Sequence, residues 1–177
     1  GTFFYEDKIF GWRTSGGVKA GDITAPFDRE DAWGVLDWGR GAWPHESQWF
    51  WGAGYGVIDG HDVAFNMGAG LDANQQASAD GILVDGVIQK LGAFDGMTWE
   101  MDPEDPLKPW VIESPDGRMN LTLTPHTHVP TELDIGGYYM HGTKVYGAYN
   151  GTLVLDDCTV LEVNDIPGFA EKSIQRW

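Results

Sequence analysis

The amino-acid sequence predicts an all-β protein built as an antiparallel barrel or sandwich. Segments in which apolar and polar residues alternate recur about every 8–15 residues, and turn-forming pairs such as Asp-Gly separate them, as in successive hairpins. Glycine makes up 25 of the 177 residues and tryptophan nine, a composition that favours strands and turns over helices. We therefore expect about ten short strands in one domain that spans residues 1–177.

The chain up to residue 44 contains three predicted strands, one helical turn and one irregular segment. Ser15-Gly16-Gly17 is a turn signal between two short alternating runs, which would form a hairpin. In chain order we expect a strand at 8–15, a strand at 17–21, one helical turn at 28–32, a strand at 32–38 and irregular backbone at 39–44.

The next predicted strand, 48–57, alternates large rings with glycines. Trp49, Trp51 and Tyr55 would lie on one face, whereas Gly52 and Gly54 would lie on the other. Two interpretations are open. The rings fill a packed core, or they line a cavity inside a barrel, where the glycines relieve crowding as the strand bends.

Turn-forming pairs divide the remainder of the chain into hairpins. Asp59-Gly60 and Asp85-Gly86 are typical of two-residue hairpin turns, and Pro115-Asp116-Gly117 is a further strong turn signal. In order, we expect a strand at 61–67, a loop at 68–80, a hairpin over 82–89, a loop at 99–108, strands at 110–114 and 119–124, two or three strands within 138–149 and 152–163 with Asp156-Asp157 as a turn, and at 167–177 a closing strand, with a short helix as the alternative.

Composition excludes several classes of partner. The 27 acidic and 11 basic residues give a formal net charge of -16, which disfavours nucleic acid and anionic lipid as partners. No apolar run approaches the roughly 20 residues of a membrane span, and no signal peptide is present, so we expect a soluble protein, cytoplasmic rather than secreted. The single cysteine, Cys158, excludes an internal disulfide. No dinucleotide or phosphate-binding motif appears, and we expect no cofactor.

One group of polar residues lies among tryptophans and has the composition of an acid–base site. In sequence order the group contains Asp37, Trp38, Arg40, Trp43, His45, Trp49 and Trp51. A carboxylate and an imidazole among indoles would have shifted pKa values and could share a proton. Such an acid could protonate an alkene, and the aromatic faces could stabilise the resulting cation. The alternatives are a structural Asp37–Arg40 ion pair and an ordinary surface histidine at His45.

Two further polar positions carry alternative interpretations. Asn66 lies between two apolar residues of a predicted strand, where it would either hydrogen-bond a ligand in the lumen or bind the turn ahead of Gly68. Near the C-terminus, Glu171, Arg176 and Trp177 would lie at the rim of the barrel, most simply as a structural pair that closes it.

A weaker hypothesis concerns a metal site. His126 and His128 are two residues apart, so a regular strand would place both imidazoles on one face, and Glu132 could complete a facial triad. Pro125 and Pro130, however, indicate an edge strand or a loop. The surrounding spacing differs from that of established metal motifs, and the prediction remains that no metal is bound.

A series of short motifs, taken in their order along the chain, resembles one family. The motifs are 37–44 (DWGRGAWP), 49–51 (WFW), 65–70 (FNMGAG), Asp85-Gly86, Lys90-Leu91, Pro109-Trp110, Asp116-Gly117-Arg118, 168–171 (GFAE) and Arg176-Trp177. Together they resemble the C-terminal part of the family filed as domain of unknown function 2804. The chain departs from that pattern at Ser78-Ala79-Asp80, where the family has Thr-Glu-Asn, so a role for that glutamate would be absent here or taken by Asp80.

The resemblance implies a lipocalin-like, calycin-type antiparallel barrel of about eight to ten strands. It also implies that residues 1–177 form the C-terminal half of a longer protein with a companion N-terminal barrel. More distantly, the family is similar to two-barrel proteins such as carotenoid 1,2-hydratases and some fungal cyclases, which handle isoprenoid-like or polyketide substrates in aromatic cavities. A shared fold does not by itself assign a reaction.

Two functions follow as hypotheses. The first is binding of an apolar small molecule in an aromatic-lined barrel cavity, with Trp38, Trp49, Trp51, Tyr55 and Asn66 as ligand contacts. The second is a cofactor-independent hydratase, isomerase or cyclase in which Asp37 is the acid, assisted by Arg40 and His45, and in which the rings of Trp49 and Trp51 stabilise a cation. Whether the protein is an enzyme is left open by the sequence.

Overall fold

The computed structural model describes residues 3–70, 78–92 and 96–177, and these contain thirteen β-strands and no helix. The predicted loop 68–80 lies largely outside the described residues. The strands are β1 (Phe3–Arg13), β2 (Gly16–Ala20), β3 (Ile23–Phe27), β4 (Trp33–Ala42), β5 (Glu46–Ile58), β6 (His61–Ala69), β7 (Gly81–Val84), β8 (Val87–Lys90), β9 (Thr98–Glu100), β10 (Trp110–Glu113), β11 (Met119–Ile135), β12 (Tyr138–Val154) and β13 (Val160–Arg176).

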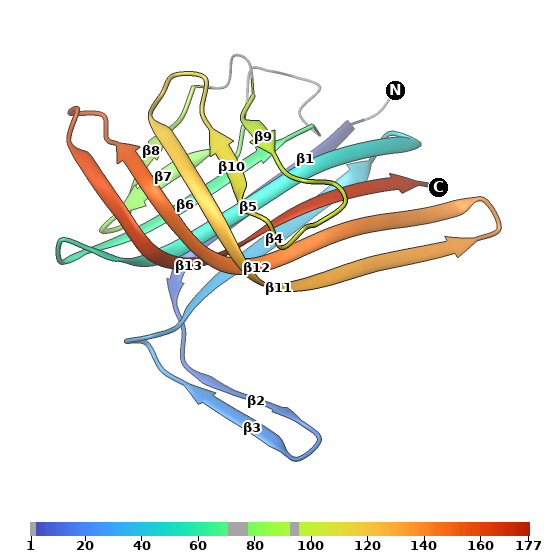
Figure 1. Ribbon diagram of the computed structural model, residues 1–177, viewed down its shortest axis with the longest axis horizontal. Coiled ribbons are helices and arrows are strands. Elements are labelled where there is room, and N and C mark those ends of the chain that lie inside the picture. Colours follow the sequence, from blue (N-terminus) through green and yellow to red (C-terminus); the bar gives the residue numbers. More distant parts are fainter. Residues whose placement is uncertain (1–2, 71–77, 93–95) are drawn as a thin grey trace.

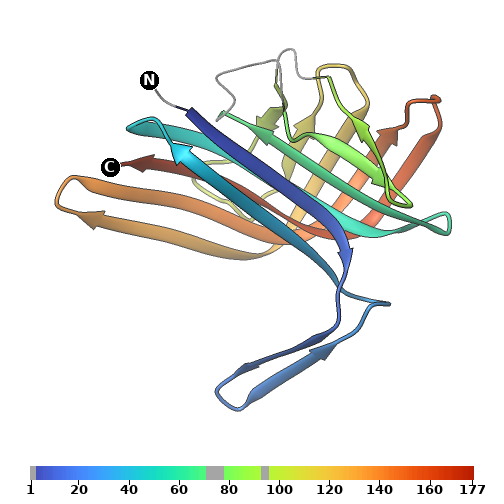
Figure 2. The same ribbon diagram turned by 180° about the vertical axis from the view of Figure 1, so that it is seen from behind.

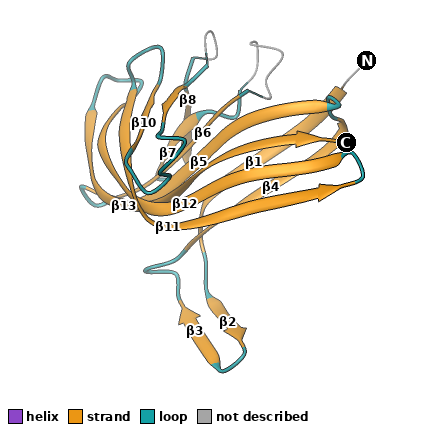
Figure 3. Ribbon diagram, turned by 45° about the vertical axis from the view of Figure 1, so that its right-hand side comes forward, coloured by secondary structure: helices purple, strands orange, loops and turns teal. Residues whose placement is uncertain are grey.

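Nine of the strands form one antiparallel main sheet with the order β8-β7-β6-β5-β13-β12-β11-β10-β9. The sheet curls strongly, so that its two edges come round the same interior (Figures 1 and 3). Within the described residues the edge strands β8 and β9 do not pair with each other, and the sheet is a half-barrel. The predicted all-β, antiparallel class is confirmed, with nine strands in the curled sheet.

The main sheet is built around three strands that are longer than expected. β11, β12 and β13 each span 17 residues, whereas we expected several shorter strands over the same region. Pro125 and Pro130 lie within β11 and do not break it. β10 pairs only with residues up to Leu123, so beyond that point β11 is an edge strand with one partner, where a missing N–H is tolerated. The expectation of an edge is confirmed.

The interior of the curl is a packed apolar core. It joins both arms of the main sheet, since Phe65 and Ile82 of β6 and β7 belong to the same buried cluster as Trp110 and Ile112 of β10. Burying one large apolar side chain contributes about 1.5–3 kcal/mol. The half-barrel is therefore held in its curl by side chains from both of its ends.

The glycines of β5 face this core. A Cβ on Gly54 would lie 2.2 Å from Cζ of Phe65, and a Cβ on Gly56 would lie 2.5 Å from Cδ1 of Ile166. The absence of side chains lets large groups from neighbouring strands pack against the backbone of β5. Because faces alternate, Trp49 and Trp51 lie on the opposite side, which we call the outer face of the main sheet. The interpretation of these rings as facing the lumen was wrong.

A two-stranded β1–β4 ribbon covers the outer face of the main sheet. Figure 2 shows this ribbon crossing the sheet, with the β2–β3 hairpin standing away from it. Phe10 of β1 and Trp33 of β4 pack on a cluster that includes Tyr55 and Phe169. Along β1 the exposed and half-buried side chains alternate, so that one face of the ribbon meets the main sheet and the other meets solvent.

The pairing of the N-terminal strands differs from the prediction. β1 pairs with β4, and β2 pairs with β3 around a turn at Gly21 and Asp22, so the expected hairpin around Ser15-Gly16-Gly17 does not form. Residues 39–42, expected to be irregular, continue β4. At 28–32 the amide of Ala32 donates to the carbonyl of Asp28 at 3.0 Å, which forms the single helical-type turn that we expected.

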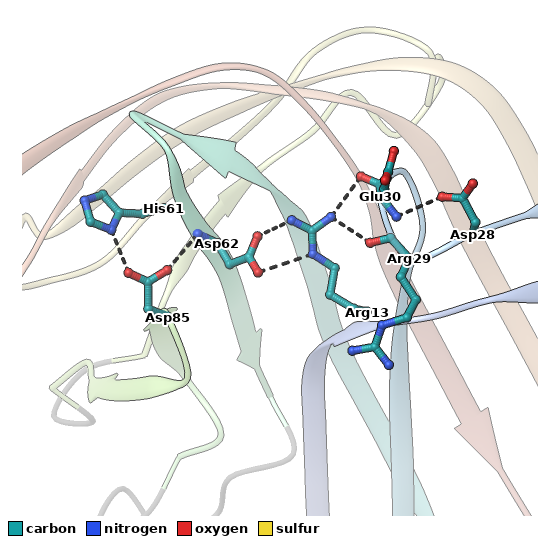
Figure 4. A network of polar contacts seen from close by, with 7 residues as sticks. All are labelled: Arg13, Asp28, Arg29, Glu30, His61, Asp62 and Asp85. Carbon is teal, nitrogen blue, oxygen red and sulfur yellow. Dashed lines mark hydrogen bonds and ion pairs between the residues drawn. The ribbon is translucent and has the colours of Figure 1, made fainter.

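An arginine joins the ribbon to the main sheet (Figure 4). The Arg13 guanidinium, at the end of β1, forms an ion pair with Asp62 of β6. Its Nη1 donates to the carbonyls of Arg29 at 2.9 Å and Glu30 at 2.8 Å, in the turn that precedes β4. Arg13 therefore connects β1 and the turn before β4 to β6 of the main sheet.

The turns predicted at the two Asp-Gly pairs are confirmed. Asp59 and Gly60 have φ values of 52° and 85°, and Asp85 and Gly86 have values of 49° and 83°, as a type I′ hairpin turn requires. A turn at Asp156 and Asp157 joins β12 to β13, and residues 167–176 are a strand and not a helix. The described part of the chain contains no helix that could cross a membrane.

Candidate functional site

A cleft of about 400 Å³ lies between the ribbon and the outer face of the main sheet. Its size falls within the range of about 300–1,000 Å³ usual for small-molecule sites. We call it the tryptophan cleft, since three indoles contribute to its walls. The lining residues are Glu6, Lys8, Asp37 and Gly39 of the ribbon, Trp49, Glu171 and Gln175 of the main sheet, and Trp43 and Trp177, which follow β4 and β13.

Trp49 is held in the wall of the cleft by polar contacts. Its Nε1–H donates to Oε1 of Glu171 at 3.0 Å, and Oε2 of the same carboxylate is 2.6 Å from Nζ of Lys144. Trp49 and Glu171 come from β5 and β13, whose paired residues bring them to the same face. The ring orientation is therefore set by protein groups alone.

Trp51 occupies a neighbouring position with its own partners. Its Nε1–H donates to Oδ1 of Asn66 at 2.8 Å, and Nδ2 of Asn66 donates to the carbonyl of Ala79 at 3.0 Å. Nζ of Lys8 lies 4.0 Å from the centroid of the Trp51 ring, which is a cation–π contact across the ribbon–sheet interface. One face of this indole is thus covered by an ammonium group.

An acid–amine cluster lies at the ribbon side of the cleft. Nζ of Lys8 contacts the carboxylate of Glu6 and lies 2.7 Å from Oδ2 of Asp37. Lys8 and Asp37 are paired residues of β1 and β4, and Glu6 shares the same face of β1. Burial raises the pKa of Glu6; Lys8 opposes that rise, and the Asp37 carboxylate adds to it. Glu6 is therefore the carboxyl group of this cluster with a raised affinity for a proton.

Four of the sequence-predicted residues lie in this cleft or in the small cavity beside it. Asp37 and Trp49 line it directly. Trp51 and Asn66 lie in an adjoining small cavity that shares Glu6, Lys8 and Trp49 with it. Asp80 lines the same small cavity, and its Oδ1 accepts from the amide of Gly68 at 2.7 Å.

Four predicted residues lie elsewhere. Trp38 is on the solvent side of the ribbon, 48% exposed, with its ring against Tyr5. Arg40 is exposed two residues further along the same strand, paired with Tyr5. His45 is exposed, and its carbonyl accepts from the amide of Trp177 at 3.2 Å. Tyr55 is buried at the other end of the ribbon. The ligand and catalytic roles of all the predicted residues stay predictions.

The cleft contains residues that the sequence did not indicate as a site. Glu6 and Lys8 lie in a segment that we had not assigned to a site, and Glu171 had been interpreted as a closing residue. In the structure Glu6 and Lys8 alternate with exposed neighbours along β1. The sequence does not say which strand lies beside them, because β1 pairs with β4, on the far side of the β2–β3 hairpin.

The predicted metal residues do not converge. His126 lies at a bulge between Pro125 and Thr127, and it lines a cavity on the outer face. His128 pairs with Val145, a core residue, and so belongs to the inner face. Glu132 is exposed further along β11. The same-face expectation was wrong because one extra residue reverses the alternation. Across the described residues, no group of three His, Cys, Asp or Glu side chains could hold a metal.

Comparison with known proteins identifies a family. The family described as Domain of unknown function (DUF2804) matches residues 1–177. No curated protein and no solved structure matches the chain. The match agrees with the family resemblance inferred from the motifs, while the more distant similarity to lipocalin-like proteins stays a prediction.

Proposed function

The chain belongs to the domain of unknown function 2804 family, and we propose that it binds an apolar small molecule in the tryptophan cleft. The indoles of Trp43, Trp49 and Trp177 would contact the apolar body of the ligand. The cluster of Glu6, Lys8 and Asp37 would receive one polar substituent. The site differs from the one first expected, because the interior of the curl is filled and the cleft lies under the ribbon.

The observation that supports this proposal most directly is the fixed position of Trp49. The Glu171 carboxylate anchors the indole nitrogen and is itself anchored by Lys144. A ring that is already oriented loses little conformational freedom when a ligand binds, so more of the contact energy appears as affinity. Indoles also supply large contact areas with few rotatable bonds.

Titration of intrinsic tryptophan fluorescence with retinol and with palmitic acid tests the proposal. We expect saturable quenching by at least one of them. In Trp49→Ala the dissociation constant should be about tenfold or more higher, since a large apolar contact is lost. Trp38→Ala is the matched control, because the Trp38 ring lies on the solvent side of the β1–β4 ribbon, away from the cleft. Equal affinity in the two variants, or no saturable quenching by either probe, would exclude this cleft as a binding site for such molecules.

A second candidate function is supported by the raised pKa of Glu6. A cofactor-independent hydratase, isomerase or cyclase needs a carboxylic acid that keeps its proton beside an apolar pocket. Glu6 would transfer that proton to an alkene carbon and become a carboxylate. The carbocation would be stabilised by the Trp49 ring and then captured by water or by a second alkene, or lose a neighbouring proton. We assign this role to Glu6 because burial raises its pKa, and Asp37, the acid first expected, lines the same cleft.

Proton transfer is tested by incubating the protein with an isoprenoid alkene such as farnesol in D₂O. We expect deuterium at an alkene carbon or a hydrated product by mass spectrometry, and its loss in Glu6→Gln. Asp7→Asn is the matched control, since Asp7 is adjacent but on the exposed face of β1. Absence of deuterium with the wild-type protein would exclude the reaction for this substrate class and leave the binding proposal untouched.

A further inference from the structure

The charged groups of the tryptophan cleft indicate the chemistry of the polar substituent that it would accept. The cleft is lined by the carboxylates of Glu6, Asp37 and Glu171 and by the ammonium group of Lys8. Glu171 is paired with Lys144, and Lys8 can balance only one of the other two carboxylates. When Glu6 and Asp37 are both ionised, the cleft therefore carries an excess negative charge, in a chain whose formal net charge is -16. Both charges favour a cationic ligand over an anionic one.

Lys8 is committed to groups of the protein itself. Its Nζ contacts Glu6 and Asp37 and lies over the ring of Trp51, and its side chain is only 10% exposed. The side chain of Asp37 is 39% exposed, compared with 22% for Glu6. Asp37 is therefore the more accessible of the two carboxylates to a cation that enters the cleft.

The interface between the ribbon and the main sheet already binds two ammonium groups in the same way. Nζ of Lys8 contacts two carboxylates and lies 4.0 Å from the centroid of the Trp51 ring. Nζ of Lys144 lies 2.6 Å from Oε2 of Glu171 and 5.2 Å from the centroid of the Phe169 ring. Each site combines a carboxylate with an aromatic face, and the same combination recognises organic ammonium ligands.

The indoles of the cleft have no such cation. None of the cation–π contacts among the described residues involves Trp43, Trp49 or Trp177. These three rings line the cleft together with Asp37. The cleft thus offers a carboxylate and indole rings without the ammonium group that accompanies them elsewhere in the interface.

We infer that the polar substituent of the ligand is an organic ammonium group, with Asp37 as its main counter-ion and the indole walls of the cleft against its N-methyl or N–H groups. The inference rests on the proposed function and narrows it to one ligand class, an amphiphile with an apolar body and a cationic head group. Such a head group gains from the carboxylate and from the negative faces of the rings, whereas an alcohol lacks the charge that both attract.

Three amphiphiles with eight-carbon chains separate the head-group chemistries. Octyltrimethylammonium is cationic, 1-octanol is neutral and octanoate is anionic. Isothermal titration calorimetry at about pH 8 compares them with the carboxyl groups ionised, and at one fixed ionic strength, because an acidic protein attracts every cation more strongly at low salt. We expect octyltrimethylammonium to bind about tenfold more tightly than 1-octanol, and octanoate to bind most weakly.

Substitutions of Asp37 test the counter-ion. Asp37→Asn should remove most of the tenfold preference for the cation and leave the binding of 1-octanol near its wild-type value, which also shows that the cleft is intact. Asp37→Glu keeps the charge and should keep the preference. Asp7→Asn is the matched control for net charge, since Asp7 lies on the exposed face of β1 and outside the cleft. Trp49→Ala should weaken the binding of both the cation and the alcohol.

The outcomes separate the inference from the proposed function. Equal affinity for octyltrimethylammonium and 1-octanol would overturn the inference and leave the proposed function standing. Equal losses of preference in Asp37→Asn and Asp7→Asn would also overturn it, because overall charge would then explain the preference. If none of the three amphiphiles binds, both proposals fail. If Asp37→Asn no longer binds 1-octanol, Asp37→Glu decides, since a preference retained there supports the inference and a preference lost there overturns it.

Discussion

The two faces of β5 carry different residues and contact different parts of the molecule. Toward the core, Gly52 and Gly54 leave room for rings and side chains from neighbouring strands to pack on the backbone. Toward the ribbon, Trp49 and Trp51 present rings whose nitrogens are held by Glu171 and Asn66. The comparison teaches that one strand can pack against the core on one side and form the wall of a cleft on the other, because alternation separates the two sets of residues.

This difference makes the two faces separable by mutation. Changes on the buried part of the inner face should lower the free energy of unfolding, because Gly52, Gly54 and Gly56 meet a packed core. Changes on the outer face should alter ligand binding more than stability, because the cleft already leaves part of that surface without protein contacts.

The largest expected effect is on the inner face. Phe65→Ala removes a fully buried ring that packs edge-on against Tyr149, with centroids 5.1 Å apart. We expect a loss of about 3–5 kcal/mol in the free energy of unfolding, measured by urea denaturation. Trp49→Ala should cost clearly less, since one side of that ring borders the cleft. A greater loss for Trp49→Ala would reverse the assignment of the two faces.

A smaller effect is expected from adding a methyl group to the inner face. In Gly54→Ala the new Cβ would lie 2.2 Å from Cζ of Phe65, so the ring must move, and we expect a loss of about 1–3 kcal/mol. Repeating the change in a Phe65→Leu background should reduce this cost, because the clashing atoms are gone. Equal costs in both backgrounds would show that the glycine is required for another reason.

The attachment of the ribbon should respond to Arg13. In Arg13→Gln the ion pair to Asp62 is lost and the contacts to the carbonyls of Arg29 and Glu30 are weakened. We expect faster amide hydrogen exchange in β1 and β4, with little change in the core strand β12. Uniformly faster exchange in all strands would mean that the ribbon and the main sheet unfold as one unit.

The smallest effect should come from a pair at two hairpin turns. Nδ1 of His61 lies 2.6 Å from Oδ2 of Asp85, and both side chains are 54% exposed. The hydrogen bond to Asp85 and its negative charge raise the pKa of His61, and the same bond lowers the pKa of Asp85. The contribution of His61 is then complete below its unfolded pKa of about 6.5 and is lost as the pH rises through the raised folded value.

That contribution is measured as the difference in melting temperature between the wild type and His61→Gln. We expect a small stabilising difference at about pH 5, where Asp85 is ionised and His61 is protonated, and a decline in that difference as the pH rises above about 6.5. A difference that grows with pH would contradict the protonated form as the stabilising one. His141→Gln provides the control, on a strand remote from Asp85.

Local features of the fold were predictable from the residues themselves. The pairs Asp59-Gly60 and Asp85-Gly86 specify hairpin turns because they tolerate positive φ at both positions. The alternation in 48–57 placed Trp49, Trp51 and Tyr55 on one face, and Asp37 was identified as a residue of the candidate site. Each of these predictions depends on neighbours that are close in the chain.

Other features were decided by tertiary structure alone. Three features depend on pairing between distant strands. They are the side of β5 that faces the core, the pairing of β1 with β4 that brings Glu6 beside Asp37, and the bulge that places His126 and His128 on opposite faces. The physical reason is that turn geometry and alternation are properties of the local backbone. Register and the choice of covered face are instead set by the packing of side chains from strands far apart in sequence.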